Sequence, residues 1–120
     1  MGEAGSRTRD DGVMTVPEID PSAVPADAYL LDVREQEEWV AGHAPEAVHI
    51  PMTQIQGRVD EVPGDRTVYV VCRVGGRSMQ VAAWLNQLGR DAVNVGGGMQ
   101  SWESARRPMV SETGQPPFVA

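Results

Sequence analysis

The sequence predicts one α/β domain in which helices cover both faces of a parallel β-sheet. Short apolar runs of strand length alternate along the chain with segments of helical periodicity, and this alternation is typical of parallel sheets. The length of 120 residues suits one compact domain, and two full domains are not expected. A content of 41% hydrophobic and 22% charged residues is that of a globular protein with a real core.

Four apolar runs are expected to form the strands of this sheet. Each is short and mostly apolar, as buried strands are. The four runs are Val13–Val16, Tyr29–Val33, Val68–Val71 and Ala92–Val95.

Helical periodicity is clearest over Ser78–Leu88. Apolar side chains recur there at spacings of three and four residues from Val81 onward and form one stripe, and Gly89 ends the helix. A second helix is expected over Glu35–Val40, because acidic side chains in its first turns would lie near the positive end of the helix dipole. Two shorter helices are predicted, over Gln54–Val59 and Met99–Ala105.

The two ends of the chain differ in composition from the part between them. Residues 1–12 and 111–120 are rich in small and polar residues and show no periodicity. We therefore expect a flexible N-terminal segment over residues 1–12, a folded domain over residues 13–110 and a flexible C-terminal tail over residues 111–120.

Charge and residue usage limit the classes of function. The net charge of −7, divided into −10 over residues 1–65 and +3 over residues 66–120, argues against a nucleic-acid partner. All ten basic residues are arginines, which excludes lysine Schiff bases and a phosphate-binding loop of the Walker type. No run approaches the ~20 apolar residues of a membrane span, and residues 1–12 hold no signal-peptide pattern. We therefore expect a cytoplasmic protein with no membrane partner.

The segment Val68–Ser78 joins a buried strand, a polar loop with glycines and the start of the clearest helix. It places Cys72, the only cysteine, at the carboxyl end of a parallel strand, where ligands bind in open α/β sheets. Gly75 and Gly76 allow backbone N–H groups to converge, and the helix start adds further N–H groups. An unpaired cysteine is otherwise a small buried hydrophobe, but such a residue needs no anion-binding loop. The loop therefore predicts a thiol with a lowered pKa.

Four sequence motifs follow one another over about residues 13–110. The first two are LLDVRE and EWVAGHAPEAVHIP, which precede the loop, and the third is the loop CRVGGRS itself. The fourth is GGMQSW followed by a proline. In order, they cover Leu30–Glu35, Glu38–Pro51, Cys72–Ser78 and Gly97–Trp102 with Pro108. Together the four motifs resemble those of the rhodanese-like domain in its single-domain form.

The resemblance implies a fold and a reaction. The fold would be a rhodanese-like three-layer sandwich with a central five-stranded parallel sheet and helices on both faces. The protein would be a thiosulfate sulfurtransferase without a cofactor, in which Cys72 is the catalytic nucleophile. It would take sulfane sulfur from a small anionic donor such as thiosulfate and pass it, as a persulfide, to cyanide, a thiol or a protein acceptor. The active-site loop that binds the donor, with Arg77 the better placed arginine, would comprise Arg73, Val74, Gly75, Gly76, Arg77 and Ser78.

Two alternatives stay open on the same fold. In the first, the domain is a non-catalytic protein-interaction or redox-sensing module in which Cys72 is incidental. In the second, the reaction is that of the related phosphatases and arsenate reductases, which carry five residues between their cysteine and arginine. Four residues separate Cys72 from Arg77, and the shorter loop favours a sulfur atom over a tetrahedral oxyanion.

Other polar residues carry weaker signals. Asp32 and Arg34 close the second strand and are candidates for the rim of the pocket, or for an ion pair that fixes the loop. Glu38 is interpreted as a helix-face or loop-holding residue. His43 and His49, with one cysteine, lack the spacing of a metal site, so structural roles and no bound metal are expected. The run Gly96–Gly98 lacks the GxGxxG spacing and is interpreted as a strand-to-helix turn.

Overall fold

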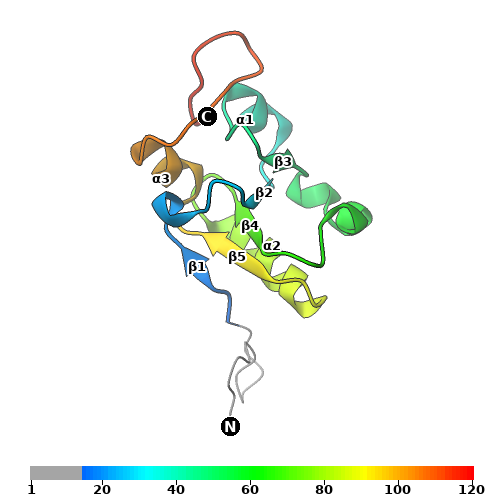
Figure 1. Cartoon of the computed structure of the whole chain (residues 1–120). Helices are drawn as coiled ribbons and strands as arrows, with labels where there is room; N and C mark the ends of the chain where they lie inside the picture. Colours follow the sequence, from blue (N-terminus) through cyan, green and yellow to red (C-terminus); the bar gives the residue numbers. More distant parts are fainter. Residues whose placement is uncertain (1–14) are drawn as a thin grey trace.

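A five-stranded sheet forms the centre of the computed structural model, which describes residues 15–120 (Figure 1). The strands lie in the order β1-β5-β4-β2-β3, and every pairing between neighbours is parallel. The predicted parallel α/β sheet is therefore confirmed. The strands are β1 (Glu18–Ile19), β2 (Tyr29–Asp32), β3 (Val48–His49), β4 (Val68–Val71) and β5 (Ala92–Val95).

The predictions for the second, third and fourth apolar runs are confirmed to within one residue, but the first strand prediction is wrong. Thr15 and Val16 belong to no strand, and the other two residues of the predicted run Val13–Val16 lie outside the described residues. The strand β1 begins only after Pro17, which has no N–H group to donate to a ladder. The carbonyl of Pro17 still accepts a hydrogen bond from the N–H of Asn94, at 2.8 Å, and this bond starts the pairing with β5.

Helices cover both faces of the sheet, as predicted. The α-helices are α1 (Gln36–Ala41), α2 (Gly76–Gln87) and α3 (Gly98–Ser104), and the 3₁₀ helices are η1 (Pro21–Ala23), η2 (Met52–Gln54) and η3 (Gln56–Glu61). The helix predicted over Gln54–Val59 is wrong in type, because two short 3₁₀ helices occupy this region and Arg58 leaves helical geometry at φ −125°. Gly57, with its low helix propensity, lies within the same stretch.

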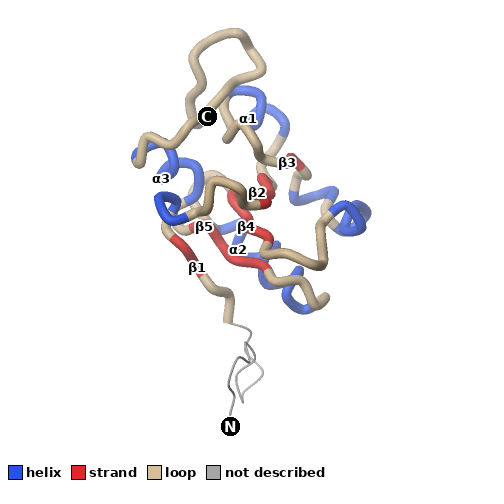
Figure 2. Tube along the Cα trace, viewed as in Figure 1, coloured by secondary structure: helices blue, strands red, loops and turns tan. Residues whose placement is uncertain are grey.

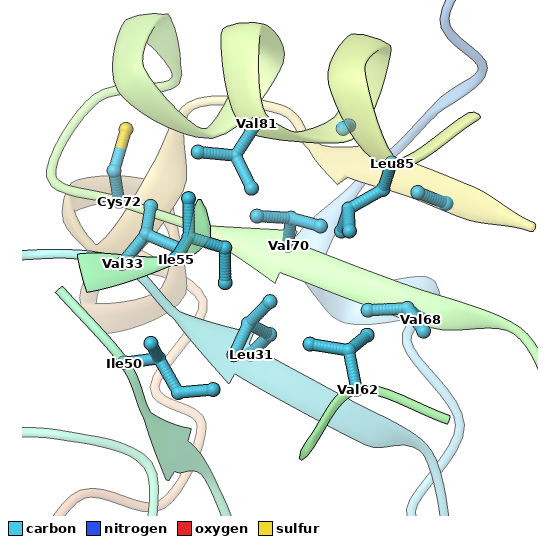
Figure 3. Close-up of a cluster of buried hydrophobic side chains, with 12 residues drawn as sticks. Leu31, Val33, Ile50, Ile55, Val62, Val68, Val70, Cys72, Val81 and Leu85 are labelled. Carbon is cyan, nitrogen blue, oxygen red and sulfur yellow. The ribbon is translucent and has the colours of Figure 1, made fainter. Parts of the chain in front are cut away.

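The buried side chains form two clusters, one on each face of the sheet. Successive residues of a strand point to opposite faces, so Leu31 joins one cluster and Leu30 the other. The first cluster lies between the sheet and α2, and Figure 3 shows Val81 and Leu85 of α2 facing Val70 of β4. The second cluster includes Val24, which follows η1, Val95 of β5, and Met99 and Trp102 of α3. The packing of the first cluster holds the end of β4 in place relative to the start of α2.

The segment after α3 returns to the domain without forming a helix or strand over residues 111–120 (Figure 2). The N–H groups of Glu112 and Phe118 donate to the carbonyls of Val40 and Ala41. A Cβ at Gly42 would overlap the backbone of Phe118, so this close approach needs a glycine. The flexibility of residues 111–120 and the domain boundaries stay predictions, and the N-terminal segment over residues 1–12 lies outside the described residues. Within residues 15–120, the helices are too short or too polar to cross a membrane.

Candidate active site

Cys72 directly follows β4 and lies at one end of the first core cluster. In Figure 3 its sulfur points away from the sheet, toward the loop that leads into α2. The residue is 1% exposed, and its Sγ accepts hydrogen bonds from the N–H of Gly75 at 3.1 Å and from the hydroxyl of Ser78 at 3.2 Å. The loop therefore folds around the sulfur atom, with its donors aimed at it.

Two opposing effects act on the thiol of Cys72. Burial is the largest single effect and raises the pKa, because it penalises the charged form. Hydrogen bonds from the hydroxyl and N–H of Ser78, and from the N–H groups of Gly75 and Val74, stabilise the thiolate and together outweigh burial. The net effect lowers the pKa of Cys72 below its ordinary value, so more of the thiol is ionised near neutral pH.

Two glycines shape the backbone around the sulfur. Gly75, at φ +118°, is in the left-handed region and precedes the first turn of α2. Gly98, at φ +58°, lies against the loop from the other side, and a Cβ there would overlap the backbone of Cys72 and Arg73. The N–H of Met99 donates to the carbonyl of Cys72 at 2.8 Å. The predicted turn after β5 therefore packs the start of α3 onto the active-site loop.

The two arginines of the loop have different partners. Arg77 forms a two-pronged ion pair with Glu38 of α1, with N–O distances of 2.8 and 2.9 Å. The hydrogen bond from Arg77 lowers the pKa of Glu38, so the carboxylate stays ionised. Arg73 is exposed, and its Nε donates to the main-chain oxygen of Ala120 at 3.0 Å. Of the two roles considered for Glu38, the structure therefore supports the loop-holding one, and the carboxylate offsets part of the charge of Arg77.

Asp32 and Arg34 form an ion pair. This was one of the two roles considered for them from the sequence, and the other was a place on the pocket rim. Both side chains are 0% exposed, and Nη2 of Arg34 lies 2.7 Å from Oδ2 of Asp32. The same Nη2 donates to the carbonyl of Gly42 at 2.8 Å. Because both side chains are fully buried, neither lines an accessible surface, and the pair ties the end of β2 to the turn after α1.

The two histidines bond to groups outside the active-site loop. His43 lies between the carbonyl of Ala44 and the carboxylate of Glu112, at 2.8 and 2.6 Å, and Nε2 of His49 contacts the carbonyl of Arg34 at 2.8 Å. Both rings stack on Trp39. Their contacts are those of structural residues. No group of three metal-binding side chains gathers within residues 15–120.

The loop residues Val74 and Gly76 are at the surface, beside the buried Cys72 and Ser78. Sequence reasoning missed Asn94, which is fully buried on β5 and whose Nδ2 lies 3.4 Å from the carbonyl of Gly75. The signal was present as one amide side chain inside the apolar run Ala92–Val95.

A separate cavity of about 250 Å³ lies on the opposite face of the sheet from α2. Leu30 and Trp102 line it with other apolar side chains, and none of its lining residues belongs to the loop from Cys72 to Ser78. The cavity is therefore separate from the thiol and its loop.

Comparison with known proteins agrees with this geometry. The family model described as the rhodanese-like domain matches residues 20–105. YtwF of Bacillus subtilis, named as a candidate sulfurtransferase, is 44% identical over 80 residues, which cover 67% of this chain and 78% of that protein. A protein of Allochromatium vinosum named sulfurtransferase is 39% identical over 89 residues, which cover 73% of this chain and 83% of that protein.

A solved structure shows the same fold. The crystal structure of a rhodanese-related protein from Thermoplasma volcanium superimposes with a TM-score of 0.74 at 30% sequence identity. The match covers 78% of this chain and 97% of that one. The resemblance seen in the four motifs is confirmed, and the chain belongs to the rhodanese-like domain family.

Proposed function

We propose that the protein is a thiosulfate sulfurtransferase that carries sulfane sulfur as a persulfide on Cys72. The observation that carries this proposal is a single thiol that accepts hydrogen bonds from Gly75 and Ser78 and has a lowered pKa. The relatives named as sulfurtransferases, at 39 and 44% identity, support a rhodanese-like sulfurtransferase. Thiosulfate as donor and cyanide as acceptor are what the resemblance to the family implies.

The reaction has two halves. In the first, the thiolate of Cys72 attacks the outer sulfur of thiosulfate, the sulfur–sulfur bond of the donor breaks, and sulfite leaves with the bonding electron pair. In the second, the carbon of cyanide attacks the outer sulfur of the persulfide, and the thiolate leaves as thiocyanate forms. Neither half needs a general base, because both nucleophiles react as anions. The donors aimed at the sulfur by Gly75 and Ser78 stabilise each anionic state of the residue.

Charge around the loop favours an anionic donor. Arg73 and Arg77 contribute two positive charges, and the carboxylates of Glu38 and Glu35 both act on Arg77. The guanidinium of Arg73 lies on the exposed part of the loop, where it would attract thiosulfate and the departing sulfite. Arg73 is the more available arginine, because Arg77 already binds a carboxylate through two nitrogens.

Loop size favours sulfur over phosphoryl transfer. The N–H of Gly75 and the hydroxyl of Ser78 converge on one sulfur atom at 3.1 and 3.2 Å. A tetrahedral oxyanion needs donors spread around three or more oxygen atoms, and four residues between Cys72 and Arg77 make a narrower loop.

The test is turnover by the full chain. With thiosulfate and cyanide, we expect thiocyanate to accumulate over many equivalents of protein, and with p-nitrophenyl phosphate we expect no hydrolysis. The proposal fails if the folded protein releases no thiocyanate above the buffer level. Hydrolysis of the phosphate ester through Cys72 would instead favour the phosphatase alternative.

Replacing Ser78 with alanine is expected to shift the titration of Cys72. The variant loses the largest of the contributions that lower the pKa of Cys72, so this pKa rises. Below the wild-type pKa, alkylation by iodoacetamide should then slow about fivefold, because one hydrogen bond contributes roughly 1 kcal/mol and this energy corresponds to about a fivefold change in the thiolate fraction. Above both pKa values the two rates should converge, because both thiols are fully ionised there.

The measurement is the alkylation rate against pH, followed by intact mass, which is unambiguous because the chain has one cysteine. Ser104→Ala, at the exposed end of α3, is the matched control and should react like wild type. Identical profiles for Ser78→Ala and wild type would contradict the role of the hydroxyl.

A further inference from the structure

The hydroxyl of Ser78 has two acceptors but only one proton. Its Oγ lies 3.2 Å from Sγ of Cys72 and 3.2 Å from the carbonyl oxygen of Gly75. A hydroxyl donates one hydrogen at a time, so the sulfur and the carbonyl compete for it. Other donors to that carbonyl therefore decide how often the sulfur receives the proton.

Two other groups donate to the carbonyl of Gly75. The N–H of Met79, in the first turn of α2, lies 3.1 Å from the oxygen, and Nδ2 of Asn94 lies 3.4 Å from it. A carbonyl oxygen has two lone pairs, and these two donors suffice to occupy them. The proton of Ser78 is then left for the sulfur of Cys72.

The amide of Asn94 has only one orientation that fits its surroundings. The residue is fully buried on β5, and its Nδ2 also donates to the carboxylate of Glu18 on β1 at 2.8 Å. Both groups at this end, the carboxylate of Glu18 and the carbonyl of Gly75, are acceptors, so the amide must turn its NH₂ group toward them.

Among residues 15–120, the side-chain oxygen of Asn94 makes no comparable contact, so the NH₂ group is the part of the amide that bonds to the protein. Oδ1 of Asn94 is buried and has no hydrogen-bond partner in the part of the chain that the structure describes. A buried amide oxygen without a partner lowers stability, and an apolar side chain of similar size would avoid that loss. The NH₂ group is thus the half of the side chain that makes specific contacts, one to Glu18 and one to Gly75.

We propose that Asn94 is a positioning residue for Cys72 and that Glu18 orients it. Asn94 holds the carbonyl of Gly75, whose N–H points at the sulfur, and leaves the proton of Ser78 to that sulfur. Asn94 bonds to the loop at the carbonyl of Gly75 and acts on the sulfur through Gly75 and Ser78. The inference rests on the proposed function in one respect, namely that the thiolate of Cys72 is the nucleophile.

The test compares Asn94 of β5 with Asn86 of α2, a second asparagine whose side-chain amide makes hydrogen bonds. Asn94→Leu keeps the size of the side chain and removes the donor. Asn86→Leu is the matched control, because the amide of Asn86 bonds to the backbone of Ala92, at the end of β5 far from the loop. In the full chain, we expect Asn94→Leu to be alkylated by iodoacetamide about fivefold more slowly below the wild-type thiol pKa and equally fast at high pH. Asn86→Leu should follow the wild-type profile.

The outcomes separate positioning from general destabilisation. A wild-type profile for Asn94→Leu, or equal shifts in both leucine variants, would overturn the proposal.

A second pair of variants, at Glu18, is used if Asn94→Leu does not fold. Glu18→Gln and Glu18→Met both remove the charge of an exposed side chain on a strand at the sheet edge, but only glutamine keeps an acceptor for Asn94. Slower alkylation of Glu18→Met than of Glu18→Gln supports the proposal, and equal rates contradict it.

Alkylation needs no sulfur donor or acceptor, so this test is independent of turnover. If wild type forms no thiocyanate while Asn94→Leu shifts the thiol titration, the positioning role stands and the sulfurtransferase proposal fails. If wild type turns over and Asn94→Leu titrates like wild type, the positioning role alone fails.

Discussion

Replacing Cys72 with serine is expected to reduce thiocyanate formation from thiosulfate and cyanide to the level of buffer. The chain has no second cysteine to take over the reaction. A serine hydroxyl stays protonated where the Cys72 thiol ionises, and it cannot hold the transferred sulfur as a persulfide. Serine is close in size to cysteine, so the core around position 72 should still pack. The measurement is the steady-state rate of thiocyanate release.

Thermal unfolding serves as the control for this variant, because a melting temperature near that of wild type shows that the loss lies in the chemistry. Ser104→Ala, remote from the loop, should keep the full rate. Thiocyanate release by Cys72→Ser at a rate near that of wild type would show that another group transfers the sulfur.

Replacing Asp32 with alanine is expected to destabilise the fold by about 3–5 kcal/mol, because it leaves a buried charge without a partner. Arg34 is 0% exposed, and its Nη1 has no hydrogen-bond partner within the described residues even in the wild-type protein. Domains of this size have a total unfolding free energy of about 5–15 kcal/mol, so the variant should be close to unfolding at physiological temperature. The measurement is the urea midpoint.

Two further variants define the cause of this effect. Glu61→Gln breaks an exposed ion pair, in which the side chain of Arg58 is 37% and that of Glu61 51% exposed. This variant should leave the urea midpoint nearly unchanged. The double variant Asp32→Ala with Arg34→Met removes both buried charges and should recover much of the lost stability. A midpoint for Asp32→Ala equal to that of Glu61→Gln would contradict the importance of the buried pair.

The sequence predicted those parts of the fold in which local pattern and tertiary packing agree. The strand β4, the loop and α2 form one continuous segment with apolar, glycine and helical patterns in turn, so the position of Cys72 follows directly. The first strand was misplaced because Pro17, and not hydrophobicity, decides where pairing starts. The strand β3 has two residues, too few to show a period.

The sequence predicted the residues of the loop itself, but not which distant residues contact that loop. The loop around Cys72 is contiguous, whereas the contacts that hold it come from distant positions. Glu38 meets Arg77 from 39 residues away, and Asn94 meets Gly75 from 19 residues away. These contacts depend on the strand order, which places β5 between β4 and β1, and no local periodicity encodes that order.

Intact mass spectrometry after incubation with thiosulfate tests the central claim most directly, because the claim is a covalent sulfur on one named atom. The folded wild-type chain should gain the mass of one sulfur atom, lose it when cyanide is added, and gain nothing if Cys72 is first alkylated. A chain that stays at its original mass, or a sulfur adduct that forms equally on Cys72→Ser, would contradict the persulfide account.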